Sequence, residues 1–284
     1  MLTDTFHSIA TAARKVLKNW KSMVLIAIVY AALLAALYFF MAVREASIVQ
    51  VALTFGLAIA ALVLFFLLHA MIAGGVAERI DSDAELSIGS LIRRSAANLW
   101  KLVVISLPLI AVAVLVAYLL GKAQNYFAVS PDAANDMLER AASSRTRNSE
   151  RPPIDWPVAT ISSVRYLFFG LFLPLATIHL WLATVREGLW PAVRRIATHL
   201  SNAFAPQSVL IYIVGFLVFG LLPYLLLFKT TSTTEAWLEI LLLVARLAGV
   251  FGLTLFGWVI TVWALSLFAT PPIRSQSEPA TEAV

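Results

Sequence analysis

The chain has 284 residues, of which 61% are hydrophobic and 13% charged, with a net charge of +5 and a mean hydropathy of +0.86. A soluble domain has about 45–50% apolar and about 25% charged residues, so this composition excludes an ordinary water-soluble protein. The basic residues stand beside apolar runs, where anionic lipid headgroups account for them more simply than nucleic acid, and no nucleic-acid partner is expected. Because the chain has no cysteine, disulfides, thiolate metal sites and a cysteine nucleophile are excluded.

Three stretches, at about 6–21, 88–101 and 190–204, combine an apolar helical face with basic residues. Their apolar residues recur three and four positions apart, which places them on one side of a helix. A basic helix of this kind can lie flat at a membrane surface, so we expect three cytoplasmic in-plane amphipathic helices. Their basic residues are candidate contacts for anionic lipid headgroups: Arg14, Lys15, Lys18, Lys21, Arg93, Arg94, Lys101, Arg194 and Arg195.

Six apolar runs are long enough to cross a membrane. A helix rises about 1.5 Å per residue, so about 20 apolar residues cross roughly 30 Å of hydrocarbon. The runs are approximately 23–43, 48–73, 102–120, 165–184, 209–228 and 248–269. The first two are separated by a few residues only, which predicts an antiparallel hairpin. The fold class is therefore all-α, a polytopic integral membrane protein that forms a single membrane domain over 1–284.

The last run is longer than one upright helix needs. From Trp237 to Ala269 it carries only two charged residues, Glu239 and Arg246. We interpret 235–246 as an interfacial or tilted segment, with a change of direction at Gly249 and Gly252. One strongly tilted helix is the alternative.

Lysine and arginine counts predict the orientation. The side that holds both termini and the 74–101 and 185–207 linkers has twelve basic residues, against nine on the other side. Six of those nine lie in one long segment, where the positive-inside rule has less weight. Both termini are therefore expected in the cytoplasm of a bacterial inner membrane. Residues 122–160 are expected to form an extracytoplasmic loop, and 271–284 a disordered cytoplasmic tail.

The three amphipathic stretches each precede a pair of spans, which suggests a threefold internal repeat. Trp20-Lys21 and Trp100-Lys101 mark the same point in the first two copies, and His69 and His179 stand near the cytoplasmic ends of spans two and four. Internal duplication is a common origin of membrane folds. The alternative is that interface chemistry alone places Trp, Arg and Lys beside each span.

The motifs Asn19-Trp20-Lys21 and Asn98-Leu99-Trp100-Lys101, together with the paired spans, carry a family resemblance. The chain resembles a diffuse group of uncharacterised bacterial six-span membrane proteins. It is also similar to the membrane domain of some glycerophosphodiester phosphodiesterases. The resemblance implies the six-span architecture but brings no catalytic residues. No stretch outside the spans is long enough to hold the catalytic domain of those enzymes.

Ionisable residues inside spans are the candidates for a functional role, because a charge there costs at least about 2.5–3.5 kcal/mol. Neutral His69 and His179 can hydrogen-bond between helices, or, as a pair facing a cavity, relay protons. The absence of an acidic residue from either span favours the structural role. Arg246 lies either deep, where it needs a carboxylate or lipid phosphate, or at the outer interface, where it can snorkel.

Pro108, Pro174 and Pro223 fall within spans three, four and five and can kink them. Kinked spans can line a path, so a transporter or channel for a small or amphipathic solute is the alternative function. No enzyme motif occurs, and no catalytic, cofactor or metal site is expected; a membrane enzyme acting on lipids ranks third. We expect a non-enzymatic inner-membrane protein with an organising, accessory or lipid-associated role. Its partners would be anionic membrane lipids and, in an accessory role, another membrane protein.

Overall fold

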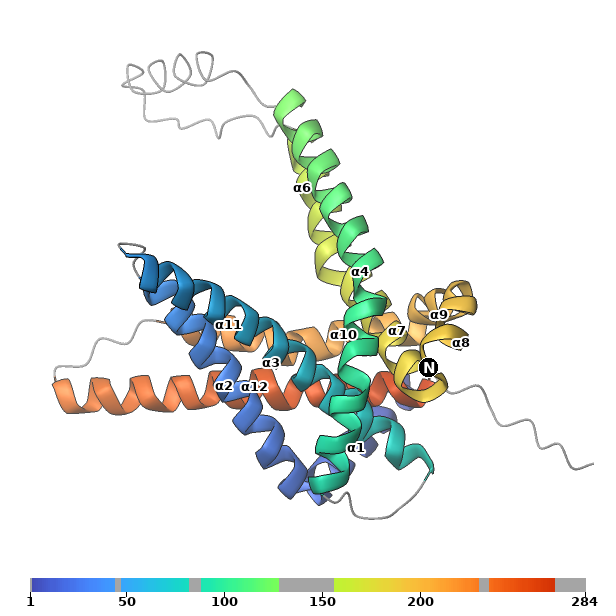
Figure 1. Ribbon diagram of the computed structural model, residues 1–284, viewed down its shortest axis with the longest axis horizontal. Helices are drawn as coiled ribbons and strands as arrows, with labels where there is room; N and C mark the ends of the chain where they lie inside the picture. The colour runs from blue at the N-terminus through green and yellow to red at the C-terminus, as the bar shows by residue number, and fades with distance from the viewer. Residues whose placement is uncertain (1, 44–46, 82–87, 128–155, 230–234, 269–284) are drawn as a thin grey trace, which may run out of the picture. The chain divides into compact units, whose positions relative to one another are not determined.

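A computed structural model of the chain describes residues 2–43, 47–81, 88–127, 156–229 and 235–268, the side chains of Leu2 and 78–81 excepted. Within these ranges all regular structure is helical (Figure 1). The α-helices are α1 (Leu2–Lys18), α2 (Trp20–Ala42), α3 (Ile48–Asp81), α4 (Ile88–Phe127), α6 (Trp156–Leu167), α7 (Leu173–Glu187), α8 (Leu189–Arg194), α9 (Ile196–Ala203), α10 (Pro206–Phe216), α11 (Leu222–Phe228) and α12 (Ala236–Phe268). Two π-helical segments, η1 (Phe168–Phe172) and η2 (Leu217–Leu221), join α6 to α7 and α10 to α11.

Six helical runs are long and apolar enough to cross a membrane. They are Trp20–Ala42, Ile48–Ala77, Ile88–Phe127, Trp156–Glu187, Pro206–Phe228 and Ala236–Phe268. They confirm the predicted all-α, six-span membrane fold. Residues 128–155 of the predicted outer loop, and the predicted tail at 271–284, lie outside the described residues.

The chain divides into two compact units. The core unit is Met1–Ser106 with Leu175–Val284, and the arm unit is Leu107–Pro174. Within the core unit, α12 contacts α1, α3, α10, η2 and α11, and α2 packs along α3 as the predicted hairpin requires (Figure 1). The Tyr30 hydroxyl on α2 lies 3.0 Å from the Thr254 hydroxyl on α12, which ties the hairpin to the central helix.

The centre of the core unit consists of three helix segments that are buried on every side. They are 68–76 in α3, 178–184 in α7 with its flanking Leu175 and Ala176, and 261–266 in α12. A helix buried all round needs apolar residues all round, which these segments largely have. Each belongs to an even-numbered span, at the end that the charge pattern predicts to be cytoplasmic. Elsewhere the spans leave much of their apolar surface exposed, as contact with lipid requires.

Helix α12 is one continuous helix of 33 residues, about 50 Å long. The predicted change of direction at Gly249 and Gly252 is therefore wrong, and the alternative of a single long helix is correct. Glycine lowers helix propensity by only about 1 kcal/mol. In hydrocarbon, leaving the helix would expose backbone groups that have no water to bond, which costs several kcal/mol each.

The three amphipathic stretches join their spans differently. The first ends at Asn19, whose side-chain amide donates a 2.6 Å hydrogen bond to the Lys15 carbonyl at the end of α1. The second is continuous with its span, because α4 runs unbroken for 40 residues. The third is divided into α8 and α9, and Gly188 (φ 91°) separates it from α7. The prediction of a separate in-plane helix at 88–101 is therefore wrong, because these residues form the first part of α4.

A π-helical turn precedes two of the three span prolines. In η1 the Leu173 N–H bonds the Phe168 carbonyl, and in η2 the Leu222 N–H bonds the Leu217 carbonyl. Each bond spans five residues instead of four, and a proline follows one residue later. Proline cannot donate a backbone hydrogen bond and its ring crowds the preceding turn, which a wider turn relieves.

Helix α12 approaches the α10–η2 segment closely at two glycines. A Cβ built on Gly257 would lie 2.9 Å from the Phe219 Cβ and 3.2 Å from its Cα and N. A Cβ on Gly215 would collide with the Thr261 side chain. Gly257 and Thr261 are four residues apart on α12, as are Gly215 and Phe219 on the α10–η2 segment. Gly257 meets Phe219 and Thr261 meets Gly215, so the two segments cross in antiparallel directions. Small residues allow such close contact between membrane helices.

Candidate functional site

Helix α1 has two faces with different surroundings. Its buried residues are mostly small and follow a three- or four-residue spacing: Thr5, Ser8, Ala12 and Val16. Because α1 contacts α12, α10 and α2, this small face packs against the protein. The large apolar residues Phe6, Leu17 and Trp20 are exposed, Leu17 to 70%. Within the 6–21 stretch these three residues are thus exposed, whereas Val16 packs against the protein.

The other two stretches repeat this division. At the start of α4, Leu91 and Ser95 are buried while Ile88, Ile92 and Trp100 are exposed. In α8 and α9 the buried residues are Ala192, His199 and Ala203. The exposed large apolar residues of α8, α9 and the turn that follows are Trp190, Val193, Ile196 and Phe204. Each stretch thus exposes several bulky apolar residues, while its buried residues are mostly small or polar, with Val16 and Leu91 as exceptions.

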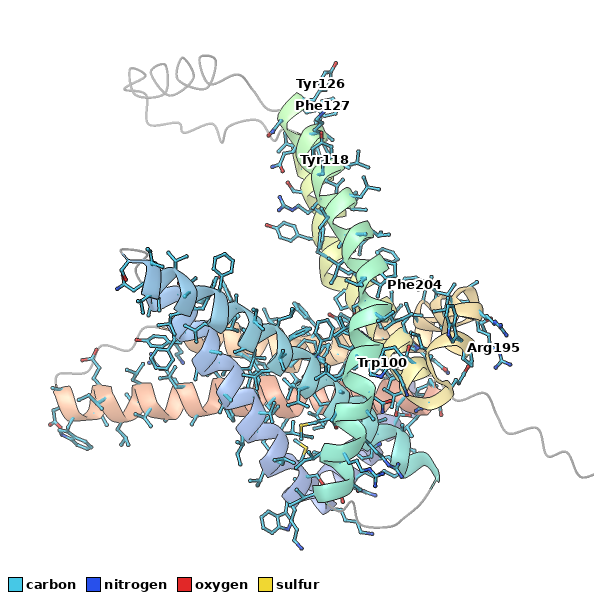
Figure 2. All side chains as sticks on the ribbon, in the orientation of Figure 1. Trp100, Tyr118, Tyr126, Phe127, Arg195 and Phe204 are labelled. Atoms are coloured by element: carbon cyan, nitrogen blue, oxygen red, sulfur yellow. The ribbon has the colours of Figure 1, made fainter. Side chains whose placement is uncertain are left out.

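The nine predicted lipid-contacting residues lie beside these outward faces. Seven are exposed, and Lys15 and Lys101 are half-buried. Lys101 Nζ donates a 2.9 Å hydrogen bond to Asn98 Oδ1, and Arg195 Nη1 lies 3.7 Å from Glu187 Oε2. Figure 2 shows Arg195 at the outer edge of α8 and α9. The outward faces therefore combine large apolar side chains with positive charge.

His69 is held among aromatic rings near the buried end of α3. Its Nδ1 lies 2.8 Å from the Phe65 carbonyl, and since a carbonyl only accepts, Nδ1 carries the hydrogen. The ring centroid lies 4.3 Å from that of Phe65, 4.6 Å from Trp181 and 5.8 Å from Trp258. These contacts join α3 to α7 and α12. The geometry fits a neutral histidine that packs between helices.

Trp181 links α7 to α4 as well as to His69. Its Nε1 donates a 2.8 Å hydrogen bond to Ser106 Oγ, which donates a 2.7 Å bond to the Leu102 carbonyl. Both side chains are buried. Sequence reasoning missed this pair because nothing in either span indicates which residue lies opposite.

His179 lies near basic residues from outside its span. It is 2% exposed, Nε2 has no hydrogen-bond partner, and the ring lies close enough to His199 and Arg186 for their charges to interact. His199 Nε2 in turn lies 3.8 Å from Glu187 Oε2. Arg186 Nη2 donates a 3.1 Å hydrogen bond to the Ser266 carbonyl near the end of α12. The sequence analysis missed His199 and Glu187 because they lie in the linker after span four.

The three predicted intramembrane residues are not brought into one site. The described contacts of His69 are with Phe65, Trp181 and Trp258, whereas the charged groups near His179 are His199 and Arg186. Arg246 is half-buried on α12, fifteen residues before the buried segment at 261–266, or about 22 Å along the helix. The pairing of His69 with His179 that a proton relay would need is therefore not seen among the described residues.

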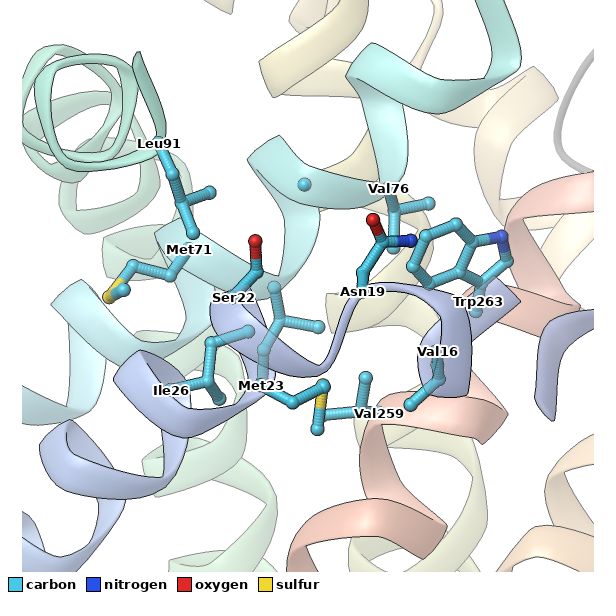
Figure 3. A pocket seen from close by; sticks show the side chains of 12 residues that line it. Val16, Asn19, Ser22, Met23, Ile26, Met71, Val76, Leu91, Val259 and Trp263 are labelled. Carbon is cyan, nitrogen blue, oxygen red and sulfur yellow. The ribbon is translucent and has the colours of Figure 1, made fainter. Parts of the chain in front are cut away.

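A small cavity lies where α1, α2, α3, α4 and α12 meet (Figure 3). The space open to the centre of a water molecule is about 20 Å³. A single water needs roughly 10–15 Å³ by the same measure, so the cavity is too small for a solute. Its wall is apolar except for groups such as the Ser22 hydroxyl and the Asn19 amide. Among the described residues, no group of three His, Asp or Glu side chains is placed to hold a metal ion.

Fold and side chains together define a multi-pass, all-α membrane protein with a packed end. No protein-family model, no curated protein and no solved structure matches the chain. The resemblance to the membrane domain of glycerophosphodiester phosphodiesterases therefore stays a prediction.

Replacing His179 by leucine tests whether its imidazole is structural. Because its buried Nε2 is unbonded, an apolar side chain of similar size removes a desolvation cost of about 1–3 kcal/mol and loses no hydrogen bond at that atom. We expect His179→Leu to leave thermal stability in detergent unchanged or raised. The same change at His69, whose Nδ1 is bonded, should lower it. A large loss of stability in His179→Leu would contradict the structural role.

Proposed function

We propose that this chain is a non-enzymatic, lipid-associated protein of the bacterial inner membrane, with both termini in the cytoplasm. It would hold anionic lipids of the cytoplasmic leaflet along three outward faces, on α1, at the start of α4, and on α8 and α9. One observation supports this proposal above all. In each stretch several bulky apolar residues, a tryptophan among them, are exposed together with most of the basic residues.

The chemistry of these faces fits a membrane surface better than water. Each face exposes a tryptophan, namely Trp20, Trp100 or Trp190, beside arginine or lysine. Tryptophan prefers the membrane interface, where its ring is in apolar surroundings and its N–H can be solvated. Basic side chains near an anionic surface contribute about 1 kcal/mol each. Two contributions are weakened, because Lys101 is bonded to Asn98 and Arg195 is close to Glu187.

The alternative function, a transporter with a path lined by spans three to five, stays a prediction. The cavity between α1, α2, α3, α4 and α12 holds about one water and offers no room for a solute. Lipid association therefore has the more direct support from exposed side chains.

Selective retention of anionic lipid tests the proposal. The purified protein would be placed in nanodiscs of phosphatidylcholine with a minority of phosphatidylglycerol, and bound lipids would be counted by native mass spectrometry. Removing one charge worth about 1 kcal/mol lowers affinity about fivefold. We expect Arg93→Gln with Arg94→Gln to lower the retention of phosphatidylglycerol relative to phosphatidylcholine at least about fivefold.

The matched control is Lys122→Gln with Arg165→Gln, which removes two positive charges near the other ends of their spans. This control should leave the lipid ratio unchanged if the cytoplasmic faces hold the anionic lipid. An equal loss in both double variants would show a general charge effect and sink the proposal. The orientation is tested separately by single cysteines, which are specific labels because the chain has none. Labelling of Lys18→Cys from the periplasm would contradict it.

A further inference from the structure

Both connections between the core unit and the arm unit contain a proline. The units divide between Ser106 and Leu107 on one connection, and between Pro174 and Leu175 on the other. Pro108 lies inside α4, two residues from the first division, and Pro174 stands at the second. The two prolines therefore mark the same boundary on two chain segments that are far apart in sequence.

Each proline weakens its helix at that boundary. Proline has no N–H, so the carbonyl four residues earlier, on Val104 or Gly170, loses its usual backbone donor. The second connection is weakened further by η1, whose wider turn ends immediately before α7. Helix kinks concentrate at prolines and π-turns because fewer backbone hydrogen bonds resist bending there.

The same π-turn and proline occur a second time in the chain, but there they are braced. In η2, Phe219 is in close backbone contact with Gly257 of α12, and η2 lies against that helix. In η1, a Cβ built on Gly170 would meet nothing within 4 Å beyond its own helix backbone. The turn at η2, which is held against α12, thus provides an internal control for the turn at η1.

The core side of the boundary is fixed. The bond from Trp181 to Ser106 joins α7 to α4, and Ser106 stands directly before the division. Ser106 also bonds the Leu102 carbonyl of its own helix. Bending of α4 and of the η1–α7 segment is therefore confined to the arm side of this bond.

We propose that Pro108 and the η1–Pro174 segment form a paired hinge, about which the arm unit moves as one body relative to the core unit. Hinges consist of a few residues that absorb backbone change while the bodies on either side keep their internal packing. Such domain motions fall in the microsecond to millisecond range. The hinge would let the arm unit adapt to a neighbouring component without disturbing the packed end of the core unit.

Distance measurements between spin labels test the hinge. Labels on Thr198→Cys in α9 and Tyr166→Cys in α6 span it, and both positions are exposed, Tyr166 to 78%. Labels on Thr198→Cys and Leu227→Cys span η2 and serve as the matched control. In nanodiscs we expect the distance distribution across the hinge to be at least about twice as wide as the control.

Two further measurements test whether the arm unit is rigid and whether the prolines cause the wide distance distribution across the hinge. Labels on Tyr118→Cys and Tyr166→Cys, both within the arm unit, should give a narrow distribution. Pro108→Ala with Pro174→Ala restores two backbone donors and should narrow the hinge distribution to the control width. Equal widths for the hinge and control pairs in the wild-type background would overturn the proposal. A broad distribution within the arm unit, or no narrowing in the proline variant, would do so as well.

Discussion

Gly257→Ala is expected to destabilise the protein, whereas Gly252→Ala in the same helix is expected to stabilise it. An alanine in place of glycine inside a helix normally adds up to about 1 kcal/mol of stability. At Gly252 the new methyl group meets nothing within 4 Å, so this gain is kept. At Gly257 it would lie 2.9 Å from the Phe219 Cβ and 3.2 Å from the Phe219 backbone. A backbone cannot move aside as a side-chain tip can, so α12 and η2 must separate.

Such overpacking costs about 1–3 kcal/mol, and more for a larger side chain. Separation of α12 from η2 would also disturb the contact between Phe219 and Trp258, whose ring centroids are 5.2 Å apart. The measurement is thermal unfolding in detergent, followed by loss of the monodisperse peak in size-exclusion chromatography. Because the two variants are expected to shift the unfolding temperature in opposite directions, the test does not depend on the protein's absolute stability. A stabilising Gly257→Ala would show that the close approach at Phe219 is wrong.

Hydropathy was sufficient to predict the six spans, because helix rise and bilayer thickness are fixed lengths. It was insufficient for the last span, where Gly249 and Gly252 have the appearance of a break in the sequence. Their helical state depends on the surrounding hydrocarbon, which favours internal hydrogen bonds over a turn. Arg246 suggested an interface because a charge inside hydrocarbon is costly. The helix nevertheless continues on both sides of it.

The amphipathic stretches show how far a pattern of single residues can be interpreted. The exposed positions of Phe6, Trp20 and the basic residues beside them follow from their chemistry. The inward face of α1 did not, because Thr5, Ser8 and Ala12 are not strongly apolar. Their burial results from the close packing of α1 on the protein, which small side chains permit. Small residues at a three- and four-residue spacing were the available signal.

The contact between Glu187 and His199 could not be predicted from the spans alone. Glu187 and His199 are separated by the Gly188 turn and α8, and they come together because α9 folds back toward the end of α7. A linker that changes direction twice leaves no periodic pattern by which such a contact could be recognised. The pairing of Trp181 with Ser106 is missed for a related reason, since it depends on the relative rotation of two spans.

Trp181→Ala is expected to have the second large effect, because Trp181 is a buried link among three helices. Truncating a buried tryptophan typically costs about 3–5 kcal/mol. Here it removes the ring contact with His69 on α3, at 4.6 Å, and the hydrogen bond to Ser106 on α4. We expect a marked loss of folded protein on purification and a lower unfolding temperature. Trp100→Ala, at an exposed position, should change stability by at most about 0.5 kcal/mol.

Two milder variants separate the ring from the hydrogen bond. Trp181→Phe keeps most of the ring packing and leaves Ser106 bonded to the Leu102 carbonyl, so it should cost about 1 kcal/mol. Ser106→Ala leaves the buried Trp181 N–H without an acceptor and should cost about 1–3 kcal/mol. Because the double variant leaves no unsatisfied donor, its cost should be less than the sum of the single variants. Strict additivity would show that the two side chains do not interact. The bond would then not fix α4 to α7.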